Sequence, residues 1–282
     1  MVKSYSKVST KQYEYLVCIR CHDYLDFVVD TYQAALHFLD LKRTRIVIAV
    51  DNNRSFCKAL RGVLKNTDIS DADIFITSSR RSWGAGLFTL LLESIAHFSS
   101  IHSFKHFVSM DYDALLLDTG LETRLDFAAT HEAIGLVGCH TFVNPHCKTI
   151  LRKEKASFTR IFGSFPTKYN IGESIQGGCF CITDLMLKAM YEKGLFQEPY
   201  LNAYQHTKMT DDYLVPYIAR ICELNISDAI NFMQCTWKAK EDPRSLRPVI
   251  VYHPMKFASR AYDVEVRNHF RSRRYETSLL KV

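Results

Sequence analysis

Two aspartates one residue apart, Asp111 and Asp113, follow an apolar run that covers residues 104–110. If the run is a strand, its period of two residues places both carboxylates on the same side, at the carboxyl end of the strand. Paired carboxylate oxygens suit a hard divalent cation such as Mg²⁺ or Mn²⁺, which also binds the oxygens of a diphosphate. The spacing therefore indicates a metal and phosphate site, although two loop aspartates that only solvate a strand end would give the same pattern.

A second acidic pair, Asp211 and Asp212, follows Thr210 and opens a segment with helical periodicity. We expect Thr210 to cap this helix and both carboxylates to lie in its first turn, where the helix dipole favours negative charge. That role alone would explain the pair. At a reaction centre, however, one carboxylate can act as a general base, and the charge of its neighbour raises its pKa toward a useful value.

A glycine pair and a late histidine are two further candidates for site residues. Gly177 and Gly178 interrupt an apolar stretch that is predicted to be a strand, and glycine is expected there when a ligand or another backbone approaches closely. A simple bulge is the alternative for the glycines. His253 follows the late apolar run 248–252 and is either a surface histidine or a metal ligand.

The elements that must position these residues alternate between strand and helix patterns from residue 13 to residue 113. This alternation predicts an α/β fold with a mostly parallel, doubly wound sheet, in which ligands bind at the carboxyl ends of the strands. The predicted strands are 13–20, 45–50, 73–76 and 104–110, and the predicted helices are 25–39, 54–64 and 87–98.

A nucleoside pocket is therefore expected at the ends of the first three strands. Asp51, directly after the second strand, is the favoured contact, with Arg20, Asp73 and Arg81 as weaker candidates. A plain turn residue is an equally simple explanation of Asp51.

The second half of the chain carries strands predicted at 133–138, 174–183 and 248–252, and helices at 184–193 and 210–219. Residues 144–170 fit no element. The last 25 or so residues are rich in arginine, and we expect them to form a basic tail that is solvated or makes peripheral contact with an anionic membrane surface. Those arginines are Arg260, Arg267, Arg271, Arg273 and Arg274.

Length and composition indicate the class of protein. With 282 residues, 47% of them hydrophobic, and no low-complexity linker, the chain is expected to be a single globular domain. The polar amino terminus lacks the apolar core of a signal peptide, and nine cysteines without a disulfide-scaffold pattern suit a reducing compartment, so we expect a cytoplasmic protein. A net charge of +6 is mild, and no nucleic-acid partner is expected.

The order of these motifs resembles that of the nucleotide-sugar-dependent glycosyltransferases with the GT-A fold, over residues 13–256. The resemblance implies a Rossmann-like GT-A domain with a nucleotide-sugar half at 13–113 and an acceptor half at 114–256, leaving 257–282 as the tail. The sequence departs from the family pattern after the first strand, where Cys21-His22-Asp23 stands in place of the usual Pro-x-Tyr-Asn.

The resemblance also implies roles for individual residues. Asp111-Tyr112-Asp113 would be the Asp-x-Asp motif that holds a metal on the donor's diphosphate, and His253 would match the late histidine ligand. Gly177 and Gly178 would lie against the donor. Asp212 would be the base of an inverting reaction, with Asp211 standing where many members carry glutamate.

These roles describe a metal-dependent hexosyl- or pentosyltransferase that uses Mn²⁺ or Mg²⁺. It would move a sugar from a nucleoside-diphosphate sugar, with uridine favoured by the family's habits, to a hydroxyl of a glycan or glycoconjugate acceptor. Two alternatives remain: a sugar-phosphate nucleotidyltransferase, and a binding relative that has lost activity. The first normally carries a glycine-rich basic loop after its first strand, which this chain lacks.

Overall fold

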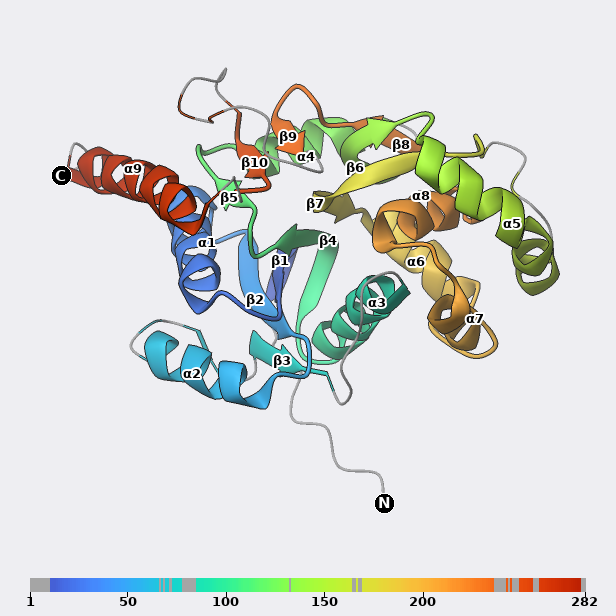
Figure 1. Ribbon diagram of the computed structural model, residues 1–282, viewed down its shortest axis with the longest axis horizontal. Helices are drawn as coiled ribbons and strands as arrows, with labels where there is room; N and C mark the ends of the chain where they lie inside the picture. The colour runs from blue at the N-terminus through green and yellow to red at the C-terminus, as the bar shows by residue number, and fades with distance from the viewer. Residues whose placement is uncertain are drawn as a thin grey trace.

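A seven-stranded mixed sheet forms the centre of the protein (Figure 1), with the strand order β3-β2-β1-β4-β7-β6-β8. The computed structural model describes residues 11–65, 67, 69–70, 73–77, 85–131, 133–163, 166, 169–235, 242, 244, 249–255 and 259–279. The strands are β1 (Gln12–Cys21), β2 (Thr44–Val50), β3 (Ile74–Ile76), β4 (Ser103–Asp111), β6 (Ile134–Thr141), β7 (Ser174–Ile182) and β8 (Asn225–Asp228).

A small second sheet, in the order β5-β10-β9, lies beside the first and delivers the late histidine. It consists of β5 (Leu115–Leu116), β9 (Met233–Cys235) and β10 (Val251–His253). The helices are α1 (Leu25–Phe38), α2 (Arg54–Leu64), α3 (Ala85–Ser99), α4 (Leu121–Ala129), α5 (Pro145–Phe162), α6 (Asp184–Glu192), α7 (Tyr200–His206), α8 (Asp211–Ile221) and α9 (Arg260–Leu279).

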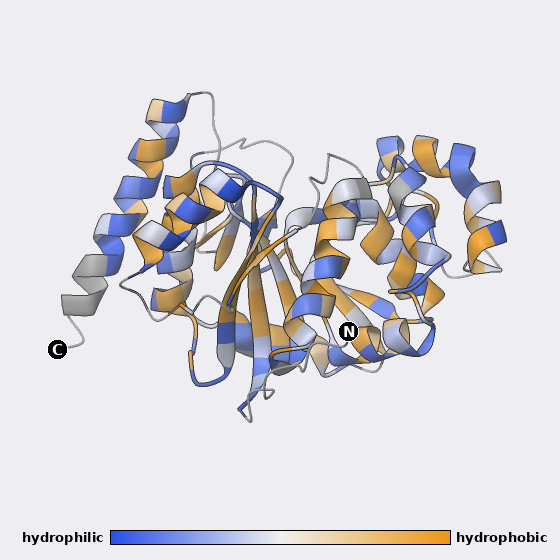
Figure 2. Ribbon diagram, turned by 90° about the horizontal axis from the view of Figure 1, so that it is seen from below, coloured by the Kyte–Doolittle hydropathy of each residue, from blue (hydrophilic) through white to orange (hydrophobic). Residues whose placement is uncertain are grey.

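The alternating side chains of β1 divide the core into two clusters, one on each face of the sheet. Tyr15, Val17 and Ile19 pack with residues of α1, α2, α4 and the small sheet, whereas Leu16 and Cys18 pack with residues of α3 and of α5 to α8. Figure 2 shows the apolar strands flanked by helices that mix apolar and hydrophilic residues. Burial on both faces explains why β1 and β2 read as nearly continuous apolar runs.

The strand directions confirm the expected α/β class and refine it. β1 pairs in parallel with β2 and β4, and β2 with β3, as the alternation of strands and helices predicts. β7 instead runs antiparallel to both β4 and β6. Met110 of β4 pairs with Cys179 of β7, and continuing this register places Gly178 level with Asp111. The reversed strand therefore brings the glycine pair beside the Asp-x-Asp motif.

Residues 144–170, which no sequence pattern assigned, contain the helix α5. Asn144 caps it by accepting hydrogen bonds from the backbone N–H groups of His146 and Cys147, and Gly163 ends it at a φ of 74°. Both are ordinary helix-end signals. The many basic side chains between them obscured a short apolar stripe of Cys147, Leu151 and Phe158, which is buried.

The expected basic tail is wrong, because residues 260–279 form the helix α9, which lies alongside α1 (Figure 1). Asp30 of α1 is completely buried and pairs with three arginines of α9. Arg267 lies 2.9 Å from it, Arg271 lies 3.3 Å away, and Arg274 makes a short contact. Arg260 pairs with Asp26 at 2.5 Å. Four of the five arginines thus bind carboxylates of α1, and peripheral contact with a membrane stays a prediction.

Asp73, a predicted ligand contact, has a structural role. It precedes β3, whereas Asp51 follows the neighbouring strand β2, so the two lie at opposite edges of the sheet, and the side chain of Asp73 is completely buried. His102 and the Nε of Arg45 lie 2.9 and 3.0 Å from its oxygens, and Ser70 also donates to it. Burial alone would raise the pKa of Asp73, but hydrogen bonds from His102, Arg45 and Ser70 hold it below its usual range.

We expect Asp73→Asn to destabilise the protein by about 1.5–3 kcal/mol at neutral pH, the usual value of hydrogen bonds to a charged group. Because the folded-state pKa is depressed, this stabilisation is present above the unfolded-state pKa of about 4 and is lost as the pH falls further. In urea titrations between about pH 3 and 7, the difference in stability between parent and variant should therefore be constant at the neutral end and should begin to narrow below about pH 4. The exposed Asp118→Asn variant is the control, and a difference that stays constant over this range would contradict the assignment.

All nine cysteines are free and buried. Among the described helices, none has both the length and the apolar character that crossing a bilayer requires.

Candidate active site

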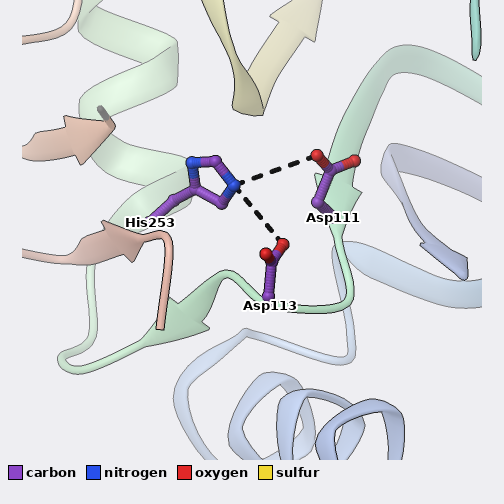
Figure 3. A group of neighbouring side chains, drawn as sticks. All are labelled: Asp111, Asp113 and His253. Carbon is purple, nitrogen blue, oxygen red and sulfur yellow. Dashed lines mark ion pairs between the residues drawn. The ribbon is translucent and has the colours of Figure 1, made fainter. Parts of the chain in front are cut away.

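Asp111, Asp113 and His253 come together at the carboxyl end of β4 (Figure 3). Asp111 is the last residue of β4, Asp113 lies in the turn before β5, and His253 ends β10. The Nε2 of His253 lies 3.3 Å from Asp113 Oδ1 and 4.0 Å from Asp111 Oδ2, and one ligand atom from each residue falls within 4.8 Å of the others. Two carboxylates and an imidazole at this separation suit a divalent cation such as Mn²⁺ or Mg²⁺.

The backbone of the Asp-x-Asp turn is held from α1 and from the chain after β10. The hydroxyl of Thr31 donates to the carbonyls of Tyr112 and Ala114 at 2.9 and 2.8 Å, and the N–H of Met255 donates to the carbonyl of Asp113 at 2.7 Å. The guanidinium of Arg267 also reaches the Tyr112 carbonyl, at 3.4 Å. These bonds fix the direction in which the two carboxylates point.

Tyr112 itself points away from the cluster. It is 5% exposed, its ring stacks on Tyr24 at 6.0 Å between centroids, and His22 meets it edge-on at 5.3 Å. The alternation that places Asp111 and Asp113 on one side turns the residue between them to the other. The ring of Tyr112 is thus buried against Tyr24 and His22, and its predicted contact with the donor stays a prediction.

The acidic pair Asp211 and Asp212 opens α8 as predicted. Asp211 is buried, and Asp212 is half-buried. Thr210 occupies the N-cap position, but its side chain makes no capping hydrogen bond. The helix therefore begins without the hydroxyl cap expected of Thr210, while the helix dipole favours both carboxylates and Arg20 pairs with Asp211.

Arg20 connects the two acidic groups. Its guanidinium is buried and donates from Nη1 to Asp211 Oδ2 at 2.5 Å, and from Nη2 to Asp111 Oδ1 at 2.7 Å and the Gly177 carbonyl at 3.3 Å. Its charge is thus engaged by groups of the protein, so the structure does not support the predicted contact between Arg20 and a nucleoside.

The four carboxylates exceed the positive charge beside them, and the pKa values of Asp111 and Asp212 are raised. Burial raises the pKa of Asp111, and Asp113 adds to the shift while Arg20 opposes it. Burial also raises the pKa of Asp212 well above its usual range, assisted by the charges of Asp211 and Asp111. A cation bound by the Asp-x-Asp group would relieve this repulsion, so the donor set and the charge balance both fit a metal site.

The glycine pair gives room for these side chains. A Cβ built on Gly177 would lie 2.1 Å from Asp212 Oδ1, and one on Gly178 would lie 2.0 Å from the ring Cγ of His253. Close approach explains the glycines, as predicted, but what approaches is the site's own side chains. This finding places β7 between the metal cluster and the acidic pair.

We expect Gly178→Ala to displace the His253 ring and to lower Mn²⁺ affinity by about 10–100-fold, the effect of disturbing the residues that orient a metal ligand. Gly62→Ala is the matched control, because a Cβ there meets nothing within 4 Å and the residue lies in α2. Calorimetric titration with Mn²⁺ would compare the two variants. Equal affinity in Gly178→Ala and the parent would show that His253 does not bind the metal from this position.

Asp51 lies at the same sheet edge, one residue beyond β2, and is partly exposed. Its N–H donates to the Cys21 carbonyl at 2.9 Å, and Thr77 Oγ1 lies 3.4 Å from its carboxylate. The nucleoside contact predicted for Asp51 stays a prediction. Asp73 is not brought to this edge, and Arg81 lies outside the described residues.

The prediction missed Thr31 and Arg267, which hold the turn from behind. Thr31 gives no signal beyond being a polar residue in an apolar helix. Arg267 does, because Arg260, Arg267, Arg271 and Arg274 are spaced by seven, four and three residues, which places them on one face of a helix.

Comparisons with known proteins bear on the fold. No family model matches the chain, and no curated protein matches its sequence. Among solved structures, the bifunctional glycosyltransferase WbbM matches with a TM-score of 0.50 and 10% identity over 93% of this chain and 50% of its own.

Two smaller proteins are similar over most of their length. Mouse xyloside xylosyltransferase 1 has a TM-score of 0.48 at 10% identity, covering 86% of this chain and 97% of its own. An active-site mutant of LgtC has a TM-score of 0.45 at 12% identity, covering 92% and 95%. The likeness to WbbM, whose TM-score reaches 0.50, concerns architecture alone at 10% identity. The chain has the GT-A fold.

Proposed function

We propose that this protein is a metal-dependent glycosyltransferase that moves a sugar from a nucleoside-diphosphate sugar to an acceptor hydroxyl with inversion. The observation that carries the proposal is the juxtaposition of two acidic groups in the GT-A fold. Asp111, Asp113 and His253 form a metal-binding set, and Asp211 and Asp212 lie beside it across Gly177 and Gly178. One group suits the leaving diphosphate and the other suits the attacking hydroxyl.

The donor would lie along the carboxyl ends of β1, β2 and β4, where ligands bind in open α/β sheets. Asp51 would contact its base or ribose, and uridine is the base we favour. Asp111, Asp113 and His253 would hold Mn²⁺ or Mg²⁺. A cation bound there would offset the negative charge that grows on the nucleoside diphosphate as the glycosidic bond breaks.

Asp212 would take the proton of the acceptor hydroxyl as that oxygen attacks the anomeric carbon. A base is most effective when its pKa lies near the working pH, and burial with two neighbouring carboxylates moves the pKa of Asp212 in that direction. Attack opposite the leaving group inverts the anomeric centre. The acceptor we propose is a glycan or glycoconjugate, and the cytoplasmic location stays a prediction.

A screen of nucleotide sugars with and without Mn²⁺ tests the proposal. A donor should raise the melting temperature of the protein when Mn²⁺ is present, because a ligand that binds only the folded state stabilises it. Incubation with that donor should release a nucleoside diphosphate. Release of pyrophosphate from a nucleoside triphosphate would identify a nucleotidyltransferase instead, and stabilisation without turnover of any donor would identify a binding protein.

A further inference from the structure

Arg20 uses its nitrogens differently from Arg45 and Arg220, two arginines that each pair with a single carboxylate. Arg45 directs its Nε and Nη2 to the two oxygens of Asp73, and Arg220 directs the same pair of nitrogens to Glu173. Each of these forms a two-pronged bond with one carboxylate, the usual geometry of an arginine pair. Arg20 instead divides its two terminal nitrogens between Asp111 and Asp211.

The partners of Arg20 come from three elements that are far apart in the chain. Asp111 ends β4, Asp211 begins α8, and Gly177 lies in β7, while Arg20 itself is near the end of β1. The planar guanidinium holds its nitrogens at fixed separation. One rigid group therefore sets the distance between the carboxylate of the metal cluster and the carboxylate of the acidic pair.

The oxygen that Arg20 binds also determines which oxygen of Asp111 remains for a ligand. Nη2 takes Asp111 Oδ1, and Oδ2 is the oxygen that faces the Nε2 of His253 at 4.0 Å. Arg20 thus orients the carboxylate so that one oxygen points toward the metal cluster. Among the described residues, the buried Nε of Arg20 has no hydrogen-bond acceptor, whereas Nε is bonded in Arg45 and Arg220. A buried donor left without an acceptor is costly. Arg267, which supports the Asp-x-Asp turn, carries the same cost at its own Nε.

We propose that Arg20 is a positioning residue that ties Asp111 to Asp211 and so fixes the spacing between the metal cluster and the acidic pair. The proposal rests on the proposed function, since that spacing separates the leaving group from the base Asp212. Arg20 acts through the carboxylates it binds and does not itself touch the donor.

Arg20→Lys tests this, with Arg220→Lys as the matched control because Arg220 is similarly buried and also paired. A lysine ammonium is a single point donor and cannot span two carboxylates as the guanidinium does. We expect the two variants to lose comparable melting temperature. Only Arg20→Lys should lose about 10–100-fold in Mn²⁺ affinity, measured by calorimetry without donor, and a larger factor in kcat than in KM.

A double-mutant cycle on Mn²⁺ affinity isolates the connection. Asp211 is not in the metal cluster, yet Asp211→Asn should weaken Mn²⁺ binding severalfold in the parent, because it releases one end of Arg20. In the Arg20→Lys background the same substitution should add little, since the connection is already broken. Additive effects in this cycle would overturn the proposal, because Asp211 would then act only through its charge.

Guanidinium rescue is the second readout. Arg20→Ala should regain part of its Mn²⁺ affinity and turnover on addition of millimolar guanidinium chloride, and Arg220→Ala should regain neither. If Arg20→Lys binds Mn²⁺ and turns over like the parent, or falls only as Arg220→Lys does, Arg20 is structural and the proposed function stands. If the parent shows no Mn²⁺-dependent donor binding or transfer, the proposed function fails and this inference fails with it.

Discussion

Replacing Asp111 and Asp113 together by asparagine is expected to abolish the Mn²⁺-dependent part of nucleoside diphosphate affinity. Asparagine keeps the shape of each side chain but removes both negative charges, and His253 would be the one ligand left of the three that converge. A hard cation held by a single imidazole binds weakly, because carboxylate charge and ligand number set its affinity. Calorimetric titration of uridine diphosphate with Mn²⁺ and with EDTA would measure the loss.

The metal-independent part of the affinity serves as the internal control. Contacts at the ends of β1 and β2, including Asp51, are unchanged in this variant, so nucleotide binding in EDTA should match that of the parent. Circular dichroism should also be unchanged, since the turn is held through the backbone carbonyls of Tyr112 and Ala114. Metal-dependent affinity equal to that of the parent would exclude these carboxylates as the metal site.

Asp212→Asn should lower the transfer rate by about 10²–10⁴-fold, the range for loss of a general base, with near-normal melting and donor binding. A role confined to the helix dipole predicts the reverse, a loss of about 0.3–1 kcal/mol in stability with normal turnover. Asp184→Asn separates the two, because Asp184 also stands in the first turn of a helix, α6, and its side chain is exposed.

The pH dependence of kcat gives a further check on Asp212. Its carboxyl must be ionised to accept a proton, and its pKa is raised, so the rate should fall on the acid side at a higher pH than an ordinary aspartate would give. The Asp212→Asn variant should lose this acid limb. Nuclear magnetic resonance of the new linkage should show the anomeric configuration opposite to that of the donor, and retained configuration would exclude single displacement with Asp212 as base.

Periodicity predicted the first half of the fold well. The runs at 13–20, 45–50 and 104–110 correspond to β1, β2 and β4, and the helices between them are α1 to α3. The spacing of apolar residues does not indicate in which direction a strand runs. The sequence therefore could not predict that β7 is antiparallel to β4 and β6. That reversal places Gly178 level with Asp111 and builds half of the site.

Individual site residues were predictable where a strand end fixed their position. Asp111, Asp113 and His253 each close or follow a strand, and the structure brings them together. Asp73 precedes its strand and is therefore buried at the other end. Arg20 also lies near the end of a strand. Its partner Asp211 is 191 residues away, so no local pattern could show that the charge of Arg20 is already paired.

The site depends on helix α9, although α9 follows every residue of the metal cluster in the sequence. Every residue of the predicted metal cluster has been synthesised by residue 253, yet the completely buried Asp30 and the carbonyl of Tyr112 have no arginine to bind until residue 267 follows. Leaving a buried carboxylate without its partner costs about 3–5 kcal/mol. A nascent chain that has not yet been extended past residue 267 therefore contains the reactive side chains without their support, and the site is complete only when α9 has formed.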